Sequence, residues 1–187
     1  MAAKRAGWHE SLAGESPAQM VFVDESGAST RMTRWRGRAP TGQRLVARIP
    51  HGHYQTSTLI AGVGLRGACA PWLFDGAMDG EMFLAWVRQG LAAVLQFGDL
   101  VIMDNLATHK VAGVREAIEA VGARLLYLPP YSPDFNPIEN MWSKIKQALR
   151  SRSPRTQTEL LIAAALAFDS ISSADCLGFF LHARYAI

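Results

Sequence analysis

Three carboxylates stand next to stretches that fold into regular structure, and their chemistry suits metal binding. Asp24 follows the apolar residues 20–23, and Asp104 follows the apolar residues 100–103. Glu139 follows a proline-rich segment and opens a run with helical spacing. Carboxylate oxygens are hard ligands, and no pair of His or Cys residues lies beside them at ligand spacing. The set therefore favours Mg²⁺ or Mn²⁺ over Zn²⁺.

Two of these carboxylates also have structural interpretations. Glu139 comes three residues after Asn136, so the pair fits a capping box at a helix start. Asp104 stands at the end of an apolar run, where an Asp often forms a turn. Spacing alone does not separate these interpretations from a role in metal binding, and the surrounding elements have to decide between them.

The segment around Asp104 predicts a βαβ unit. Residues 100–103 form a short apolar run bounded by turn signals, which is typical of a buried strand. From Val111 the apolar residues follow helical spacing until Gly122, and residues 124–128 form a second apolar strand. The two strands should be parallel with a right-handed crossover. The carboxyl ends of such strands hold ligands in open α/β sheets, and Asp104 lies at one of them.

Glu139 is expected to be presented by a stiff loop. Four prolines fall at positions 129, 130, 133 and 137, and each fixes φ and disfavours helix in the residue before it. Asn136 followed by Pro137 predicts a helix start, with Asn136 as the N-cap residue. The helix that follows has an apolar face of Ile138, Met141, Trp142, Ile145 and Leu149.

The remaining elements complete an α/β fold. Residues 20–23 predict a strand ending at Asp24, and residues 54–65 and 70–74 predict a β-hairpin. Helices are expected over 81–95, over 156–171 with a Thr156–Glu159 capping box, and over 173–184. Three antiparallel strands followed by two parallel ones are typical of ribonuclease H-like nucleases, in which the first and fourth strands are neighbours. Residues 1–18 are expected to be a linker or a frayed helix before a catalytic domain at 19–187.

Basic residues are concentrated in two segments. The formal net charge is only +3 and the sequence pI about 9.1. Residues 31–48 and 144–155 nevertheless contain no acid, and arginine forks match phosphate geometry. The clusters favour nucleic-acid contact over a merely solvated surface. The candidate DNA-binding residues are Arg31, Arg34, Arg36, Arg38, Arg44, Arg48, Lys144, Lys146 and Arg150.

Composition excludes several classes of protein. Hydrophobic residues make up 49% and charged residues 19% of the chain, as in ordinary globular domains. No apolar run reaches 18 residues and the start has no signal-peptide pattern, so neither a membrane span nor secretion is expected. Cys69 and Cys176 are far apart, form no metal motif and fit a reducing cytosol.

Four long segments carry a resemblance to a known family. They are VFVDESG at 21–27, TRWRGRAPTGQRL at 33–45, GDLVIMDNLATHK at 98–110 and LLYLPPYSPDFNPIENMWSKIK at 125–146. With them, the chain resembles the catalytic domain of mariner-like transposases, specifically the bacterial insertion sequence 630 family. The 34 residues between Asp104 and Glu139 are typical of that family's acidic triad.

The resemblance implies a DDE-type transposase and a set of residue roles. Asp24 would bridge two Mg²⁺ or Mn²⁺ ions, and Asp104 and Glu139 would each complete one metal site. Asn105 and His109 are candidates for orienting the substrate or the metal ligands, although His109 also fits an ordinary helix start. Glu25 should point to the opposite face of its strand and is left out of the triad.

The resemblance also implies partners and a place of action. These are double-stranded DNA, a second copy of the chain when active, and the bacterial cytoplasm at the nucleoid. Family members usually begin with helix-turn-helix modules, and the residues before Asp24 are too few for them. A DNA-reading part is therefore expected from elsewhere. Two alternatives remain: an idle or regulatory DNA-binding relic, and another ribonuclease H-like nuclease.

Overall fold

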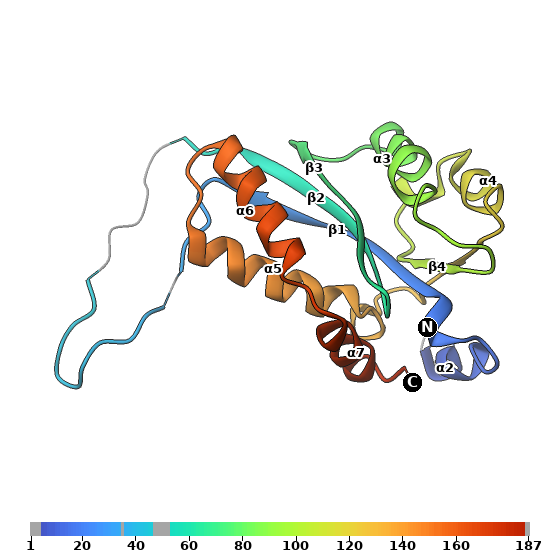
Figure 1. Ribbon diagram of the computed structural model, residues 1–187, viewed down its shortest axis with the longest axis horizontal. Helices are drawn as coiled ribbons and strands as arrows, with labels where there is room; N and C mark the ends of the chain where they lie inside the picture. The colour runs from blue at the N-terminus through green and yellow to red at the C-terminus, as the bar shows by residue number, and fades with distance from the viewer. Residues whose placement is uncertain (1–4, 35, 47–52, 186–187) are drawn as a thin grey trace.

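The strands form one mixed sheet in the order β3-β2-β1-β4-β5 in the computed structural model, which describes residues 5–34, 36–46 and 53–185 (Figure 1). β2 (Thr56–Gly64) runs antiparallel to both of its neighbours, β1 (Met20–Ser29) and β3 (Gly67–Asp75). β4 (Leu100–Met103) and β5 (Arg124–Tyr127) extend the sheet in parallel on the other side of β1. The predicted ribonuclease H-like arrangement, with the first strand beside the fourth, is confirmed.

Strand β1 is longer than the sequence indicated, and this changes the position of Asp24. Residues 20–23 pair in parallel with β4, while residues 22–29 pair with β2. The apolar run ends at Val23 because only residues 20–23 are buried on both faces of the sheet. Residues 24–29 pair with β2 alone. Asp24 therefore lies inside a strand, at the point where its parallel pairing stops.

The helices agree with the predicted segments, with local differences. The segment expected as helix 81–95 begins as α3 (Gly80–Trp86) and continues as a π-helical turn at Val87–Leu91. The helix expected from Val111 starts later, as α4 (Val114–Glu119), because Val111 is extended and Gly113 adopts φ 96°. Short 3-10 turns, η1, η3 and η4, occupy Pro17–Gln19, Thr108–Lys110 and Pro133–Phe135.

Three helices follow the proline-rich loop: α5 (Ile138–Arg152), α6 (Gln157–Asp169) and α7 (Ser173–His182). The Thr156 side chain caps α6 by accepting from Glu159 N at 3.1 Å. The predicted capping box is only half formed, because the Glu159 carboxylate accepts from Arg155 N at 2.6 Å instead of from the Thr156 backbone. None of the helices in the described ranges is long and apolar enough to span a membrane; α6 and α7 reach that length only as a pair bent by 82°.

Alternation along β1 divides the core into two layers. Met20 and Phe22 pack with α5, α6 and α7 on one face of the sheet, whereas Val21 and Val23 pack with α3 and α4 on the other. Because successive strand residues point to opposite faces, Asp24 faces the α5 side and Glu25 faces the α3 side. The predicted separation of these two carboxylates follows directly from the period of the strand.

The N-terminal segment is part of the folded domain. Residues 5–12, expected to be a linker or frayed helix, contain α2 (Trp8–Ser11), and both Trp8 and Leu12 are buried. The Trp8 indole N–H donates to Tyr185 Oη at 2.9 Å, and Tyr185 Oη donates to the Phe135 carbonyl at 2.7 Å. Helix α2 and Tyr185 thus meet beside the proline-rich loop. In Figure 1, α2 and α7 lie close together.

Candidate active site

The three predicted carboxylates line one pocket. Its volume is about 440 Å³, and Asp24, Asp104 and Glu139 all contribute to its wall. Val23 pairs with Met103, so the two aspartates follow adjacent points of parallel strands. The other lining residues are Asn105, Leu106, Lys110, Leu128, Pro129, Pro130, Tyr131, Ser132, Pro133 and Asn136.

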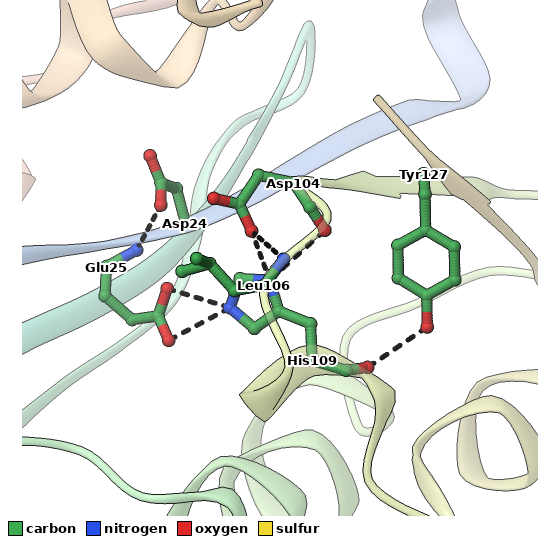
Figure 2. Close-up of polar contacts among 6 residues, drawn as sticks. All are labelled: Asp24, Glu25, Asp104, Leu106, His109 and Tyr127. Carbon is green, nitrogen blue, oxygen red and sulfur yellow. Dashed lines mark hydrogen bonds and ion pairs between the residues drawn. The ribbon is translucent and has the colours of Figure 1, made fainter. Parts of the chain in front are cut away.

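Each aspartate has one oxygen held by the surrounding structure (Figure 2). Asp24 Oδ1 accepts from Glu25 N at 2.8 Å. Asp104 Oδ1 accepts from Leu106 N at 3.1 Å and from His109 Nδ1 at 2.7 Å. In Figure 2 the second oxygen of Asp104 points towards Asp24. The carboxylates are therefore oriented before any ligand binds.

The site accumulates negative charge around Asp24. Burial is the largest cause that raises the pKa of Asp24, and the nearby carboxylates of Glu25, Glu139 and Asp104 add to it. Together they bring the pKa to about 7, against the opposing hydrogen bond from Glu25 N. Crowded carboxylates of this kind disfavour one another's ionised form. A cation bound among them would relieve that repulsion.

A buried histidine connects Asp104 to the opposite face of β1. His109 has no exposed surface, and its Nε2 lies 2.9 Å from Glu25 Oε2 while its Nδ1 lies 2.7 Å from Asp104 Oδ1. Burial lowers the pKa of His109, but the hydrogen bonds to Asp104 and Glu25 outweigh burial and raise it to about 10. The imidazolium therefore donates from both nitrogens and fixes the Asp104 carboxylate.

The same contact affects the charge of Asp104. Burial raises the pKa of this carboxyl, but the hydrogen bonds from His109 and Leu106 N are stronger in sum and bring the pKa below its usual value. His109 is packed against Phe83, with ring centroids 4.4 Å apart.

The contact of Glu25 with His109 was not predicted from the sequence. Alternation along the strand shows which face Glu25 occupies but does not show that His109 lies there.

Glu139 is not used as a helix cap. The N-cap position of α5 is Pro137, one residue later than predicted, and the Asn136 side chain makes no capping hydrogen bond. The Asn136 N–H donates to the Pro133 carbonyl at 3.0 Å instead of to Glu139, so the capping box is absent. Glu139 is exposed in the first turn of α5 and lines the pocket.

Two polar residues complete the pocket wall on the Asp104 side. Asn105 is exposed there, as expected for a residue that could contact a substrate. Lys110 was not singled out from the sequence; its ammonium lies 5.5 Å from the centre of the Tyr127 ring. Lys110 brings a positive charge to a pocket that is otherwise acidic.

The donor set fits hard divalent ions. Within residues 5–34, 36–46 and 53–185, no three side chains of the types His, Cys, Asp or Glu are already arranged around a single point. The fit therefore rests on chemistry: three carboxylates share one pocket, and one oxygen of each aspartate is already oriented. Such ions take oxygen ligands and can complete their shell with water or phosphate oxygens.

The structure gathers part of the predicted basic set near the end of α5. Lys146 and Arg150 line a groove of about 450 Å³ beside β1 and β2, and Arg34 and Arg36 share a second hollow of about 350 Å³ with Arg150. The Arg34 guanidinium also hydrogen-bonds to the Ser151 hydroxyl. These four residues form one surface, named here the basic groove.

The other basic residues are placed differently. The Arg31 guanidinium lies 5.4 Å from the centre of the Tyr54 ring. Lys144 is paired with Asp175 of α7 at 2.5 Å, so its charge is partly neutralised. Arg38 and Arg44 are exposed in the loop after β1, and Arg48 lies outside the described residues.

The basic groove is separated from the pocket. Glu139 and Arg150 stand at opposite ends of α5, and 1.5 Å of rise per residue puts them about 16 Å apart along the helix. That separation corresponds to about five base pairs of duplex DNA at roughly 3.4 Å each.

Comparison with known proteins supports the architecture. The structure is similar to that of a pre-cleavage Mos1 transpososome, with a TM-score of 0.78 and 14% identity, over 97% of this chain and 58% of that one. It is also similar to the catalytic domain of Mos1 mariner transposase, with a TM-score of 0.67 and 13% identity, over 99% and 93% of the two chains. No curated protein matches the sequence.

These similarities show a shared fold, and the chain spans less than two thirds of the length of the Mos1 transpososome chain. The sequence adds independent evidence. The family model of the DDE superfamily endonucleases matches residues 19–161, which includes Asp24, Asp104 and Glu139. Because this match covers well over half of its residues, the chain belongs to the DDE superfamily endonucleases.

Proposed function

We propose that this chain is the catalytic part of a DNA transposase of the insertion sequence 630 type. It would cut DNA at the ends of an insertion element and join the freed 3′-hydroxyl to target DNA. The observation that carries the proposal is the convergence of Asp24, Asp104 and Glu139 on one pocket. The fold shared with Mos1 in its strand transfer complex supports it.

The metal requirement belongs to this proposal. Mos1 paired-end complexes contain Mn or Mg, and the carboxylates here suit either ion. Two such ions, when bound, would lower the pKa of an attacking water and stabilise the leaving oxygen. Asp24, which is half-buried and close enough to both Asp104 and Glu139 to feel their charges, would contribute to both metal positions. Asp104 and Glu139 would each serve one.

The protein's own contribution is positioning. His109 and Glu25 hold the Asp104 carboxylate in one orientation, since the imidazolium donates to both acids. Glu139 projects from the first turn of α5, a helix whose apolar face is buried. Fixed ligands of this kind reduce the reorganisation that the reaction requires.

The DNA would run from the pocket along α5 to the basic groove. Lys146, Arg150, Arg34 and Arg36 would contact phosphates about three to five base pairs from the cut, counting roughly 3.4 Å per pair. Phosphate contacts position a duplex without reading its sequence. Recognition of the element's ends would therefore require a helix-turn-helix part beyond these residues, and two copies of the chain would pair the two ends at the bacterial nucleoid.

A cleavage assay tests the proposal. The protein is incubated with Mg²⁺ and labelled duplex carrying the element's ends, beside an Asp104→Asn control. Nicks at the element boundary that require both the metal and Asp104 are expected. Cleavage that continues in chelator, or that the Asp104→Asn protein catalyses at the same rate, would overturn it.

A further inference from the structure

We infer that Asn136 is a substrate-positioning residue whose side-chain amide binds a non-bridging oxygen of the phosphodiester that is cut. The inference rests on the proposed function and adds a residue to it. The sequence assigned Asn136 to a helix cap, and the structure shows that it does not act as one.

The position of Asn136 is unusual for a polar residue. It is only 3% exposed, and its side-chain oxygen has no hydrogen-bond partner although it is buried. It also lines the same pocket as Asp24, Asp104 and Glu139. Buried amides are normally hydrogen-bonded, and leaving one unpaired is unfavourable. An amide whose oxygen is unpaired at the wall of a pocket indicates a group reserved for a ligand.

The backbone around Asn136 holds it in place. The Asn136 N–H donates to the Pro133 carbonyl, and the Asn136 carbonyl accepts from Glu139 N at 3.1 Å. Pro133 and Pro137 restrict the chain on both sides. The amide and the Glu139 carboxylate are therefore presented to the same pocket by one rigid turn.

The chemistry of the pocket explains why an amide is useful there. The carboxyl groups of the pocket offer mainly acceptor oxygens, whereas an asparagine amide supplies two N–H donors without charge. Rotation of the amide by half a turn exchanges its oxygen and nitrogen, so either group can face the pocket. A phosphate oxygen is the acceptor that a two-metal site brings to this position.

Asn136→Ala provides the test, with Asn140→Ala as a matched control. Asn140 is four residues along the chain, is half-buried and does not line the pocket. Cleavage of end-carrying duplex is measured under single-turnover conditions with Mn²⁺. Asn136→Ala should be slower by about tenfold or more, the size expected for one hydrogen bond to a charged group. Asn140→Ala should match the wild type.

Thermal unfolding separates this role from a structural one. Removing an unpaired buried amide should leave the melting temperature unchanged or raise it. If the Asn136 side chain instead had a structural role, Asn136→Ala should lower the melting temperature. A duplex with sulfur in place of one non-bridging oxygen at the cut phosphate gives a second readout. For one of the two diastereomers, sulfur should slow the wild type more than it slows Asn136→Ala.

The outcomes distinguish this inference from the proposed function. Equal rates for the wild type and Asn136→Ala, equal sulfur effects in both, or a lowered melting temperature would overturn the role of Asn136 alone. If the wild type does not cut DNA, the proposed function fails instead. Duplex binding in Ca²⁺ then decides for Asn136: weaker binding by Asn136→Ala supports the phosphate contact, and equal binding overturns it.

Discussion

Two irregular segments of this protein are held in very different ways. The proline-rich loop, residues 129–137, receives contacts from both ends of the chain. Arg5 donates to the Tyr131 carbonyl at 2.7 Å and to Asp134 at 2.8 Å, and Tyr185 donates to the Phe135 carbonyl. In the arginine-rich loop after β1, by contrast, residues 36–46 are exposed throughout and project from the body (Figure 1).

The difference matches what each segment has to do. Glu139 and Asn136 must place atoms to within a fraction of an ångström, and this requires a backbone fixed by its neighbours. Arginines that contact phosphates need reach and charge, and such contacts tolerate variation in position. We therefore expect changes near the proline-rich loop to alter the rate of cutting, and changes in the basic groove to alter affinity for DNA.

The strongest test of this division removes metal-binding charge. Asp24→Asn, Asp104→Asn and Glu139→Gln each keep the size of the side chain. Each should slow cleavage at least about a thousandfold, because several kcal/mol of transition-state stabilisation depend on the bound ions. DNA affinity in the absence of metal should not fall. Single-turnover cleavage and a binding titration measure the two properties separately.

The same variants also report on metal binding. Mg²⁺ or Mn²⁺ should raise the melting temperature of the wild type, since the ion binds the folded form. The shift should shrink in Asp24→Asn, because the Asp24 carboxylate lies near both of the others. A Glu139→Gln protein that cuts at the full rate would reduce Glu139 to an ordinary residue of the first helical turn.

The second test concerns the support of Asp104. Glu25→Gln removes the acid that faces His109 Nε2, and His109→Asn removes the donor to Asp104 Oδ1. Loss of a group that orients a metal ligand typically lowers activity or metal affinity by about 10- to 100-fold. We expect an effect of that size on cleavage and a higher Mg²⁺ concentration at half-maximal rate. A lowered melting temperature with normal metal dependence would instead indicate that the contacts of His109 with Glu25 and Asp104 are only structural.

The sequence predicted the positions of the carboxylates better than the groups that hold them. Apolar runs and turn signals are local, and they predicted the strands beside Asp24 and Asp104. The order of the elements then indicated a fold class in which those two strands are neighbours. The contacts of Glu25 with His109 and of Arg5 with Asp134 join residues 84 and 129 positions apart. No local pattern encodes such pairs. Asn136 shows the converse: a strong local cap signal was overridden, because the helix begins at Ile138 with Pro137 as its N-cap residue.

The third test loosens the proline-rich loop from the N-terminal side. Arg5→Ala removes the contacts to Tyr131, Ser132 and Asp134, and Asp134 is more than half exposed. Exposed ion pairs contribute only about 0–1 kcal/mol to stability, so the melting temperature should change little. Cleavage should nevertheless slow by about tenfold, because small displacements of a catalytic loop reduce the rate.

A matched control for Arg5 lies elsewhere on the surface. Arg115 forms a similarly exposed pair with Glu119 on α4, at 3.0 Å. Arg115→Ala should leave both the cleavage rate and DNA affinity unchanged. If the two arginine variants behave alike, the contacts between the N-terminal segment and the loop have no part in positioning Glu139.

The smallest effect is expected in the basic groove, and α5 offers a comparison within one helix. Arg150 lines the groove, whereas Lys144 is paired with Asp175. Arg150→Ala should weaken duplex binding by a few fold and reduce the slope of log K against log salt by about 0.9, the value for one lost phosphate contact. Lys144→Ala should change that slope much less, because its charge is already partly neutralised. Both variants should cut bound DNA at the wild-type rate.

Because phosphate contacts carry no sequence information, the loss of affinity in Arg150→Ala should be the same for end-carrying and random duplexes. An Arg150→Ala protein that loses affinity only for the element's ends would show that this exposed surface reads sequence, and the division between the two segments would then fail.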